Sequence, residues 1–361
     1  MPTPREQAAL DVLAQLKDPG TGLDWVSSKQ VKAVTEQGQN LRVQIELAYP
    51  ARSQHEALRA ALAQALEALA PLQVEIDQRI VAHSVQRGLQ PLPGVRNVIA
   101  VASGKGGVGK STTAVNLALA LQAEGARVGL LDADIYGPSI PMMMGASGKP
   151  QSEDGKTMSP LVSHGVQLMS IGFLVGDDQA MVWRGPMATG ALEQLLRQTN
   201  WDDLDYLVVD LPPGTGDIQL TLAQRVPVTG ALIVSTPQDI ALIDAKKAVR
   251  MFEKVGVPML GLVENMAVYC CPNCGHTEHI FGVDGGKTMA AQFGLAYLGA
   301  LPLVRSIREQ SDAGRPPVVA EPAGEVAGLY KSLARQVAVA VGKLGKDYAS
   351  KFPTIKISRT T

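Results

Sequence analysis

The sequence has few cysteines and almost no net charge. Three cysteines in 361 residues cannot form the disulfide framework that is typical of small secreted domains. With 33 Lys and Arg against 34 Asp and Glu, the formal net charge is -1. No overall basic field therefore attracts the chain to nucleic acid. We expect a protein of a reducing compartment, the cytoplasm, that binds no nucleic acid.

The sequence also lacks long apolar runs. No stretch approaches the roughly 18 uninterrupted apolar residues that a membrane-spanning helix requires. Residues 1–16 show no basic start followed by an apolar core and a small-residue cleavage site, so they do not resemble a secretory signal. The tail at 346–361 is interrupted by Pro353 and carries no sustained apolar stripe. We therefore expect no membrane contact.

Composition and periodicity divide the chain into four segments. Residues 1–85 combine helical patterns with an alternating strand pattern, which predicts a small α/β domain. Residues 86–94 are rich in proline and glycine without periodicity, so they are interpreted as a linker. From 95 to 345, apolar strand-like runs alternate with helical patterns. This alternation predicts an α/β fold with a mainly parallel sheet and helices on both faces. Residues 346–361 remain as a C-terminal tail.

A glycine-rich segment links an apolar run at 97–102 to a helical pattern at 112–121. Residues 104–111 read GKGGVGKS and satisfy the phosphate-binding loop pattern in full. Glycines let the backbone approach phosphates, and amides at a helix start favour anions. Lys110 then supplies charge at the outer phosphates of ATP, and Ser111 supplies a hydroxyl to Mg²⁺. The expected nucleotide-binding residues here are Gly104, Gly106, Gly107, Val108, Gly109, Lys110, Ser111 and Thr112.

Acidic residues end two of the expected strands. Asp132 and Asp134 close the strand after the glycine-rich segment, and Asp210 ends the apolar run 206–210. Carboxylates beside a triphosphate repel it unless they contact Mg²⁺ or a water molecule. We interpret Asp134 as orienting the attacking water, Asp132 as surrounding the metal and Asp210 as its carboxylate ligand. For Asp132 and Asp134, a helix cap or turn is the alternative.

The cysteines form a metal-knuckle pattern. Cys271 and Cys274 lie in a Cys-Pro-x-Cys-Gly segment, whose spacing lets both sulfurs face one ion. Four thiolates would require a second copy of the chain, related by a two-fold axis. One alternative is zinc held by the same two thiolates with His276 and His279, although these four residues lie closer together in the sequence than zinc ligands usually do. Another alternative is a redox-active pair of cysteines. Cys270 has no matching partner and is expected to be a bystander.

Taken together, the motifs resemble the Mrp/ApbC family of iron-sulfur cluster carriers. They occur in the order KGGVGKS, DADIYGPS at 132–139, DLPPGTGD at 210–217 and Glu-Asn-Met followed by the knuckle. The family belongs to the deviant P-loop ATPases of the MinD, ParA and nitrogenase iron-protein group. The resemblance implies an ATP-hydrolysing homodimer that holds a 4Fe-4S cluster at its interface and transfers it to apoproteins. Residues 1–85 resemble the iron-sulfur-assembly domain that often precedes such ATPases.

The resemblance also implies roles for single residues. Lys105 matches the extra lysine that reaches the partner's nucleotide, so Lys105, Lys110 and Asp134 are the expected catalytic residues. Asn265 matches the asparagine that reads adenine, with a turn residue as the alternative. Two other functions stay open. A MinD/ParA-like positioning or partition ATPase would leave the knuckle unexplained, and a zinc-stabilised regulatory ATPase would require the histidines.

Overall fold

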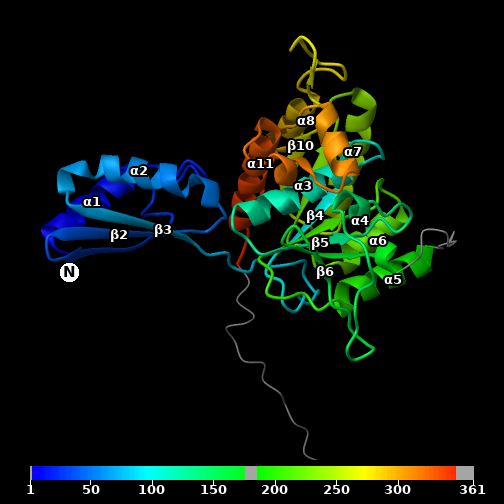
Figure 1. Cartoon of the computed structure of the whole chain (residues 1–361), viewed down its shortest axis with the longest axis horizontal. Helices are drawn as coiled ribbons and strands as arrows, with labels where there is room; N and C mark the ends of the chain where they lie inside the picture. Colours follow the sequence, from blue (N-terminus) through cyan, green and yellow to red (C-terminus); the bar gives the residue numbers. More distant parts are fainter. Residues whose placement is uncertain (1, 175–184, 347–361) are drawn as a thin grey trace, which may run out of the picture.

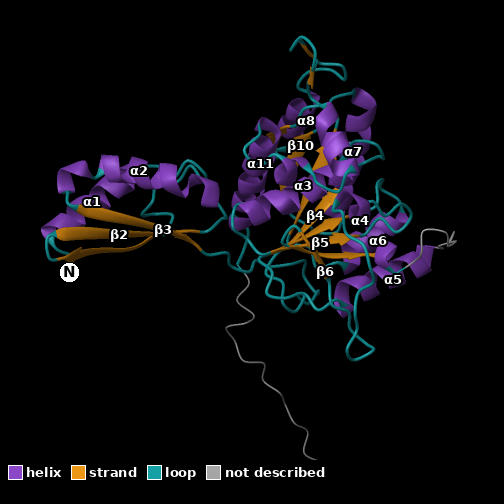
Figure 2. Cartoon of the chain, in the orientation of Figure 1, coloured by secondary structure: helices purple, strands orange, loops and turns teal. Residues whose placement is uncertain are grey.

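Two separate sheets organise the chain (Figure 1). The computed structural model describes residues 2–174 and 185–346. A three-stranded sheet lies in the N-terminal part, and an eight-stranded sheet forms the centre of the larger part (Figure 2). The expected tail at 346–361 falls outside the described residues except for Lys346.

The N-terminal domain is a sheet covered on one face by two helices. The elements are α1 (Pro4–Gln15), β1 (Val31–Gln37), β2 (Asn40–Leu47), α2 (His55–Ala65) and β3 (Leu72–Gln78). β2 lies in the middle, antiparallel to β1 and parallel to β3. Every second side chain of β2 from position 41 to 47 is buried. The period of two therefore directs one face of the sheet to the helices and the other to solvent.

The large sheet has the order β13-β10-β9-β4-β8-β5-β7-β6. All neighbouring strands pair in parallel except the edge strand β6, which is antiparallel to β7. Each apolar run that was expected to be a strand between 95 and 345 forms one, whereas the three-residue strand β6 was not predicted. The strands are β4 (Val98–Ala102), β5 (Val128–Asp132), β6 (Leu161–Ser163), β7 (Val166–Ser170), β8 (Tyr206–Asp210), β9 (Gly230–Ser235), β10 (Met259–Glu264) and β13 (Tyr297–Ala300).

Helices cover both faces of this sheet, as the sequence predicted. Along β4, Ile99 and Val101 belong to the core that includes α3 and α11, whereas Val98, Ala100 and Ala102 belong to the opposite core with α7. Strands buried on both faces are apolar throughout for this reason. The helices are α3 (Lys110–Ala123), α4 (Ile140–Met143), α5 (Gly185–Gln198), α6 (Asp217–Arg225), α7 (Asp239–Lys254), α8 (Gly285–Phe293), α9 (Arg305–Asp312), α10 (Pro317–Ala320) and α11 (Glu325–Gly342).

The end of helix α3 contacts the N-terminal domain through Glu124. This carboxylate is fully buried and accepts hydrogen bonds from the Ser53 amide at 2.9 Å and the Ser53 hydroxyl at 2.6 Å. Arg335 of α11 pairs with the same carboxylate. The Glu124 carbonyl accepts further bonds from the Arg52 amide and the Gln78 side chain, each at 3.1 Å. The helix that begins at the glycine-rich segment is thus anchored to the N-terminal domain at its other end.

Replacing Glu124 with alanine is expected to lower the midpoint of thermal unfolding by several degrees. The change removes one partner of a mostly buried ion pair and leaves Arg335 uncompensated, a loss of about 3 kcal/mol. Calorimetry of the full chain measures it. The control is Glu153→Ala at an exposed loop position. Equal midpoints for Glu124→Ala and the unaltered protein would show that the contact contributes nothing to stability.

Candidate nucleotide site and cysteine hairpin

A pocket of about 240 Å³ lies at the carboxyl end of the central strands. The glycine-rich segment follows β4, Asp134 follows β5 and Pro213 follows β8, so the parallel topology gathers residues that are distant in the sequence. Gly104, Val108, Asp132, Asp210 and Asn265 were also predicted but do not line this pocket. Its lining is Ser103, Lys105, Gly106, Gly107, Gly109, Lys110, Ser111, Thr112, Asp134, Ser139, Met143 and Pro213.

Two glycines of the loop have physical reasons to be glycine. Gly109 has a φ of +80°, and a Cβ there would lie 2.1 Å from the side-chain amide nitrogen, Nδ2, of Asn265. A Cβ on Gly104 would lie 2.1 Å from the backbone carbonyl carbon of Asp244 in α7. Any side chain would therefore displace the loop from its neighbours.

Lys110 and Asp210 form a buried ion pair within the site. The Lys110 Nζ lies 2.6 Å from Asp210 Oδ1 and 3.2 Å from the Ser111 hydroxyl. Lys110 is 6% exposed and Asp210 is fully buried. Within the described part of the chain, the buried Oδ2 of Asp210 has no hydrogen-bond partner. A buried carboxylate oxygen without a hydrogen-bond partner is suited to bind a cation.

Two further carboxylates increase the negative charge of the site. Asp132 accepts hydrogen bonds from the Ile140 amide at 3.2 Å and the Ser170 hydroxyl at 3.1 Å, and burial together with the neighbouring Asp210 charge raises its pKa to about 7. Burial also raises the pKa of Asp134, and Lys110 opposes that rise. Mg²⁺ held by the Asp210 carboxylate together with phosphate oxygens and water would relieve the mutual repulsion of these carboxylates.

Asn265 braces the glycine-rich loop from the end of β10. Its amide nitrogen donates to the Val108 carbonyl at 2.8 Å, and its backbone amide donates to the Ser235 carbonyl at 2.7 Å. Asn265 is 6% exposed. The structure therefore places this residue against the loop, while its predicted role in reading adenine stays a prediction.

Replacing Asn265 with alanine is expected to weaken ATP binding by about tenfold, the effect of one buried hydrogen bond to the loop. If the residue also reads adenine, ATP binding should fall more than GTP binding. Titration of both nucleotides with Mg²⁺ measures the difference, with Asn273→Ala in the exposed hairpin turn as the control. An equal fall for both nucleotides would contradict adenine reading and leave the bracing role alone.

The cysteines lie on a hairpin that projects beyond α8, drawn in yellow in Figure 1. Strands β11 (Tyr269–Cys270) and β12 (Thr277–Glu278) pair antiparallel. Their turn is closed by the Cys271 amide, which donates to the His276 carbonyl at 2.9 Å, and by the Gly275 amide, which donates to the Cys271 carbonyl. All three cysteines are free thiols. Cys274 is exposed and Cys271 is partly exposed, so both can reach a second molecule.

Local hydrogen bonds involve both the Cys271 thiol and the His279 ring. The backbone amides of Cys274 and Asn273 donate to the Cys271 sulfur and lower its pKa, which favours the thiolate that binds metals. The His279 Nδ1 lies 2.7 Å from the Ala267 carbonyl, a contact that orients its ring. Across residues 2–174 and 185–346, no three Cys, His, Asp or Glu side chains gather as a set able to hold a metal.

Comparison with known proteins identifies the family. Residues 94–338 match the family described as NUBPL iron-transfer P-loop NTPase, and residues 6–77 match an iron-sulfur cluster assembly protein family. The chain belongs to the iron-transfer P-loop NTPase family. The first match includes both the nucleotide pocket and the cysteine hairpin, and the second includes the N-terminal sheet.

Curated relatives of this iron-transfer NTPase extend over most of its length. A Haemophilus influenzae protein named iron-sulfur cluster carrier protein is 50% identical over 332 residues, which are 90% of this chain and 89% of that protein. A Pseudomonas fragi protein of the same name is 58% identical over 271 residues, 74% of this chain and 94% of that protein. The mouse iron-sulfur cluster transfer protein NUBPL is 56% identical over 258 residues, 70% of this chain and 81% of that protein.

Solved structures share the fold of the NTPase domain. A nucleotide-binding protein from Archaeoglobus fulgidus, in complex with ADP, has a TM-score of 0.57 and 38% identity, and covers 65% of this chain and 91% of its own. The cell division ATPase MinD from Pyrococcus furiosus has a TM-score of 0.51 at 21% identity, covering 67% of this chain and 98% of its own. The latter likeness concerns the fold alone.

Sequence analysis missed some residues of the NTPase pocket. Ser139 and Met143 line it from the start and end of α4, although neither was assigned a role from the sequence. Ser170 was not predicted as a site residue either, because its contact with Asp132 joins two strands that are neighbours only in the folded sheet. The segment DADIYGPS was a usable signal for Ser139, because it places that residue a few positions after Asp134.

Proposed function

We propose that the chain is an ATP-hydrolysing iron-sulfur cluster carrier that holds a 4Fe-4S cluster between two copies and transfers it to apoproteins. The observation that carries the proposal is one chain with both a complete phosphate-binding loop and a pair of free thiols, one exposed and one partly exposed. The names of the curated relatives support it. We place the protein in the cytoplasm. No helix of the described residues is long and apolar enough to cross a membrane.

The nucleotide site supplies binding, charge and water orientation. The loop amides and Lys110 bind the phosphates, and Asp134, which lines the pocket, orients the attacking water. Ser111 and Asp210 would hold Mg²⁺, with Asp132 behind them; bound Mg²⁺ neutralises phosphate charge. Lys110 contacts Oδ1 of Asp210, so the unpartnered Oδ2 of the same carboxylate is the oxygen that would face Mg²⁺.

The thiol site supports a homodimer. Cys271 and Cys274 are two ligands, and clusters of this class take four thiolates, so a second copy completes the set. Exposed apolar side chains occur on α7, where Ile240 and Ile243 are 70% and 53% exposed, and after the hairpin, where Val283 is 63% exposed. Single exposed apolar residues are ordinary, so the second copy is inferred from the number of thiolates that the cluster needs.

The segment after the hairpin packs against the residues that precede α7. A Cβ on Gly285 would lie 2.2 Å from the Pro237 carbonyl oxygen, directly before α7 begins at Asp239. The backbone beyond the cysteines therefore packs closely against the start of α7.

The nucleotide site and the thiols also bear on two alternative functions. A positioning ATPase shares the fold but leaves the thiols without a role. A zinc-stabilised regulatory ATPase would require His276 and His279 beside the two thiols, and no such set of three or more metal-binding side chains gathers among the described residues.

Anaerobic reconstitution with iron and sulfide tests the proposal. The product should absorb in the visible, contain about four iron atoms per dimer and transfer them to an apoprotein that requires a 4Fe-4S cluster. Metal analysis, sedimentation and recovery of recipient activity are the measurements. A colourless monomer that binds one zinc ion per chain would contradict the proposal in favour of the zinc site.

A further inference from the structure

A buried carboxylate at the end of β10 lies outside the nucleotide pocket. Glu264 is the last residue of this strand and is 3% exposed. Its side chain accepts a hydrogen bond from the Gly286 amide, in the first turn of α8. The side chain of Asp284, the residue directly before α8, makes no capping bond. Glu264 therefore caps the helix that follows the cysteine hairpin, where a negative charge is favoured.

The strand end that carries Glu264 also holds the segment that enters the hairpin. The Ala267 amide donates to the Leu301 carbonyl at 3.0 Å, which fixes the chain two residues before β11 begins. The Ala267 carbonyl lies 2.7 Å from Nδ1 of His279, which follows β12. The chain segments on both sides of the hairpin are therefore attached to residues 264–267.

The same four residues support the phosphate-binding loop. The Asn265 side chain donates to the Val108 carbonyl at 2.8 Å. Met266 has a φ of +56°, in the left-handed region that residues other than glycine rarely adopt. Its methyl group reaches the loop, because a Cβ on Gly109 would lie 3.7 Å from the Met266 Cε. Backbone strain of this kind persists only where the surrounding contacts fix it.

We propose that Glu264 is a positioning residue that couples the cysteine hairpin to the phosphate-binding loop. A nucleotide that orders the loop also orders residues 264–267 through Asn265, and Glu264 passes this restraint to the chain that leaves the hairpin at Gly286. The inference rests on the proposed function, in which the loop binds ATP and the hairpin holds the cluster. Coupling of this kind is reciprocal, so an occupied hairpin would strengthen nucleotide binding by the same factor.

A role as a helix cap alone predicts a different result. If Glu264 only capped α8, its loss would loosen the hairpin by the same factor with and without nucleotide. If Glu264 couples the two sites, its loss removes the effect of nucleotide on the hairpin. The measured quantity is therefore the ratio of hairpin exchange rates without and with nucleotide, not the stability of the hairpin.

Hydrogen exchange of the metal-free full chain, followed by mass spectrometry, tests the proposal. The probe is ADP with Mg²⁺ at a concentration that saturates each variant, with the protein dilute enough to sediment as a monomer. In the unaltered protein, nucleotide should slow exchange in residues 269–286 by about fivefold or more, the lower end of the usual coupling between sites. In Glu264→Ala, this slowing should disappear.

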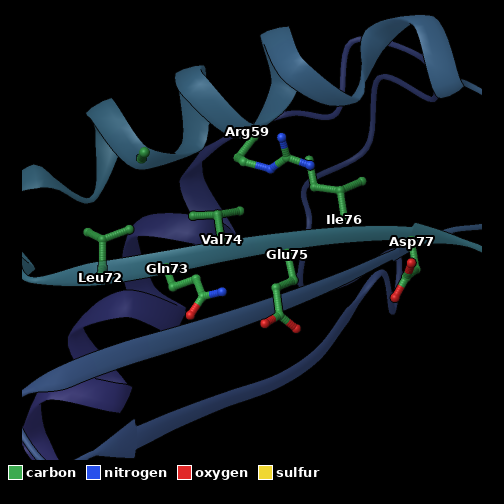
Figure 3. A pocket seen from close by; sticks show the side chains of 8 residues that line it. Arg59, Leu72, Gln73, Val74, Glu75, Ile76 and Asp77 are labelled. Atoms are coloured by element: carbon green, nitrogen blue, oxygen red, sulfur yellow. The ribbon is translucent and has the colours of Figure 1, made fainter.

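Three further variants define the connection. Glu264→Gln keeps an oxygen that accepts the bond from the Gly286 amide, so it should retain the effect of nucleotide. Asn265→Ala breaks the connection at the loop and should abolish the effect, as Glu264→Ala does. The matched control is Glu75→Ala: Figure 3 shows this glutamate on β3 of the N-terminal domain, and it is paired with Arg42 at 2.7 Å. This control should leave the effect unchanged.

Two results would overturn the proposal. Equal slowing by nucleotide in Glu264→Ala and in the unaltered protein would leave Glu264 as a helix cap alone. No slowing in the unaltered protein would show that the hairpin does not respond to nucleotide. Exchange in residues 98–102 reports whether each variant remains folded, and the Asn265→Ala result decides if Glu264→Ala does not fold. Because the protein is metal-free, failed cluster reconstitution would contradict the proposed function without changing this result.

Discussion

Replacing Lys110 with alanine is expected to lower the rate of ATP hydrolysis by about 100- to 1,000-fold, the usual loss when one charge-stabilising donor is removed. The pocket lining offers Lys105 as the other lysine, and it lies at the opposite end of the loop. Phosphate release at saturating ATP with Mg²⁺ measures the effect. Near-normal turnover would remove the assignment of the phosphate-binding loop.

The Lys110 experiment requires a variant that separates catalysis from folding. Alanine leaves the fully buried Asp210 without its partner at 2.6 Å, which also costs stability. Lys110→Gln keeps a donor beside Asp210 and should lose activity to a similar extent while unfolding at a higher temperature than the alanine variant. Lys149→Ala, at an exposed position, is the charge-matched control.

Lys105→Ala should behave differently from Lys110→Ala. The proposed target of Lys105 is the nucleotide bound to the partner subunit. In the Lys105→Ala variant, turnover of ATP should therefore fall while most nucleotide binding remains. Equal loss of binding in the two variants would place the action of Lys105 within its own subunit.

Replacing Cys271 or Cys274 with alanine is expected to eliminate the reconstituted cluster. Each change removes two of the four thiolates in a symmetric dimer, and iron-sulfur clusters depend on thiolate ligands. Visible absorption and iron content after anaerobic reconstitution are the measurements. Retention of about four iron atoms per dimer in either variant would contradict the shared site.

Neighbouring residues provide matched controls for the cysteine experiment. Cys270→Ala, His276→Ala and His279→Ala should each retain the cluster. Cys270 is an exposed thiol in β11, whereas Cys271 begins the turn. If either histidine variant lost stoichiometric metal, the zinc site within one chain would replace the cluster between two chains.

Local sequence patterns were sufficient to predict the fold class and the phosphate-binding loop. Apolar runs such as 206–210 predicted parallel strands, because strands buried on both faces carry apolar residues at every position. The loop was recognisable since its glycines, Lys110 and Ser111 all lie within eight consecutive residues. Strand β6 was missed because a three-residue strand at a sheet edge has no periodicity to detect.

Contacts between distant residues were beyond the reach of those patterns. Lys110 and Asp210 lie 100 residues apart, and Asn265 contacts the carbonyl of Val108 across 157 residues. The sequence placed Lys110 in the glycine-rich segment and Asp210 at the end of a strand, but it could not say which strands are adjacent. Strand order decided that Asp210 would pair with the lysine and that Asn265 would support the loop.

The sequence by itself determined the chemistry available to this protein: phosphate-binding amides, a lysine, carboxylates at strand ends and two thiols in a knuckle. Only the tertiary structure decided how they are deployed, with Lys110 held by Asp210, Asp132 buried behind the pocket and the thiols on a projecting hairpin. The reason is physical. Hydrophobic periodicity fixes which face of an element is buried, whereas the partner of a polar group depends on which elements pack side by side.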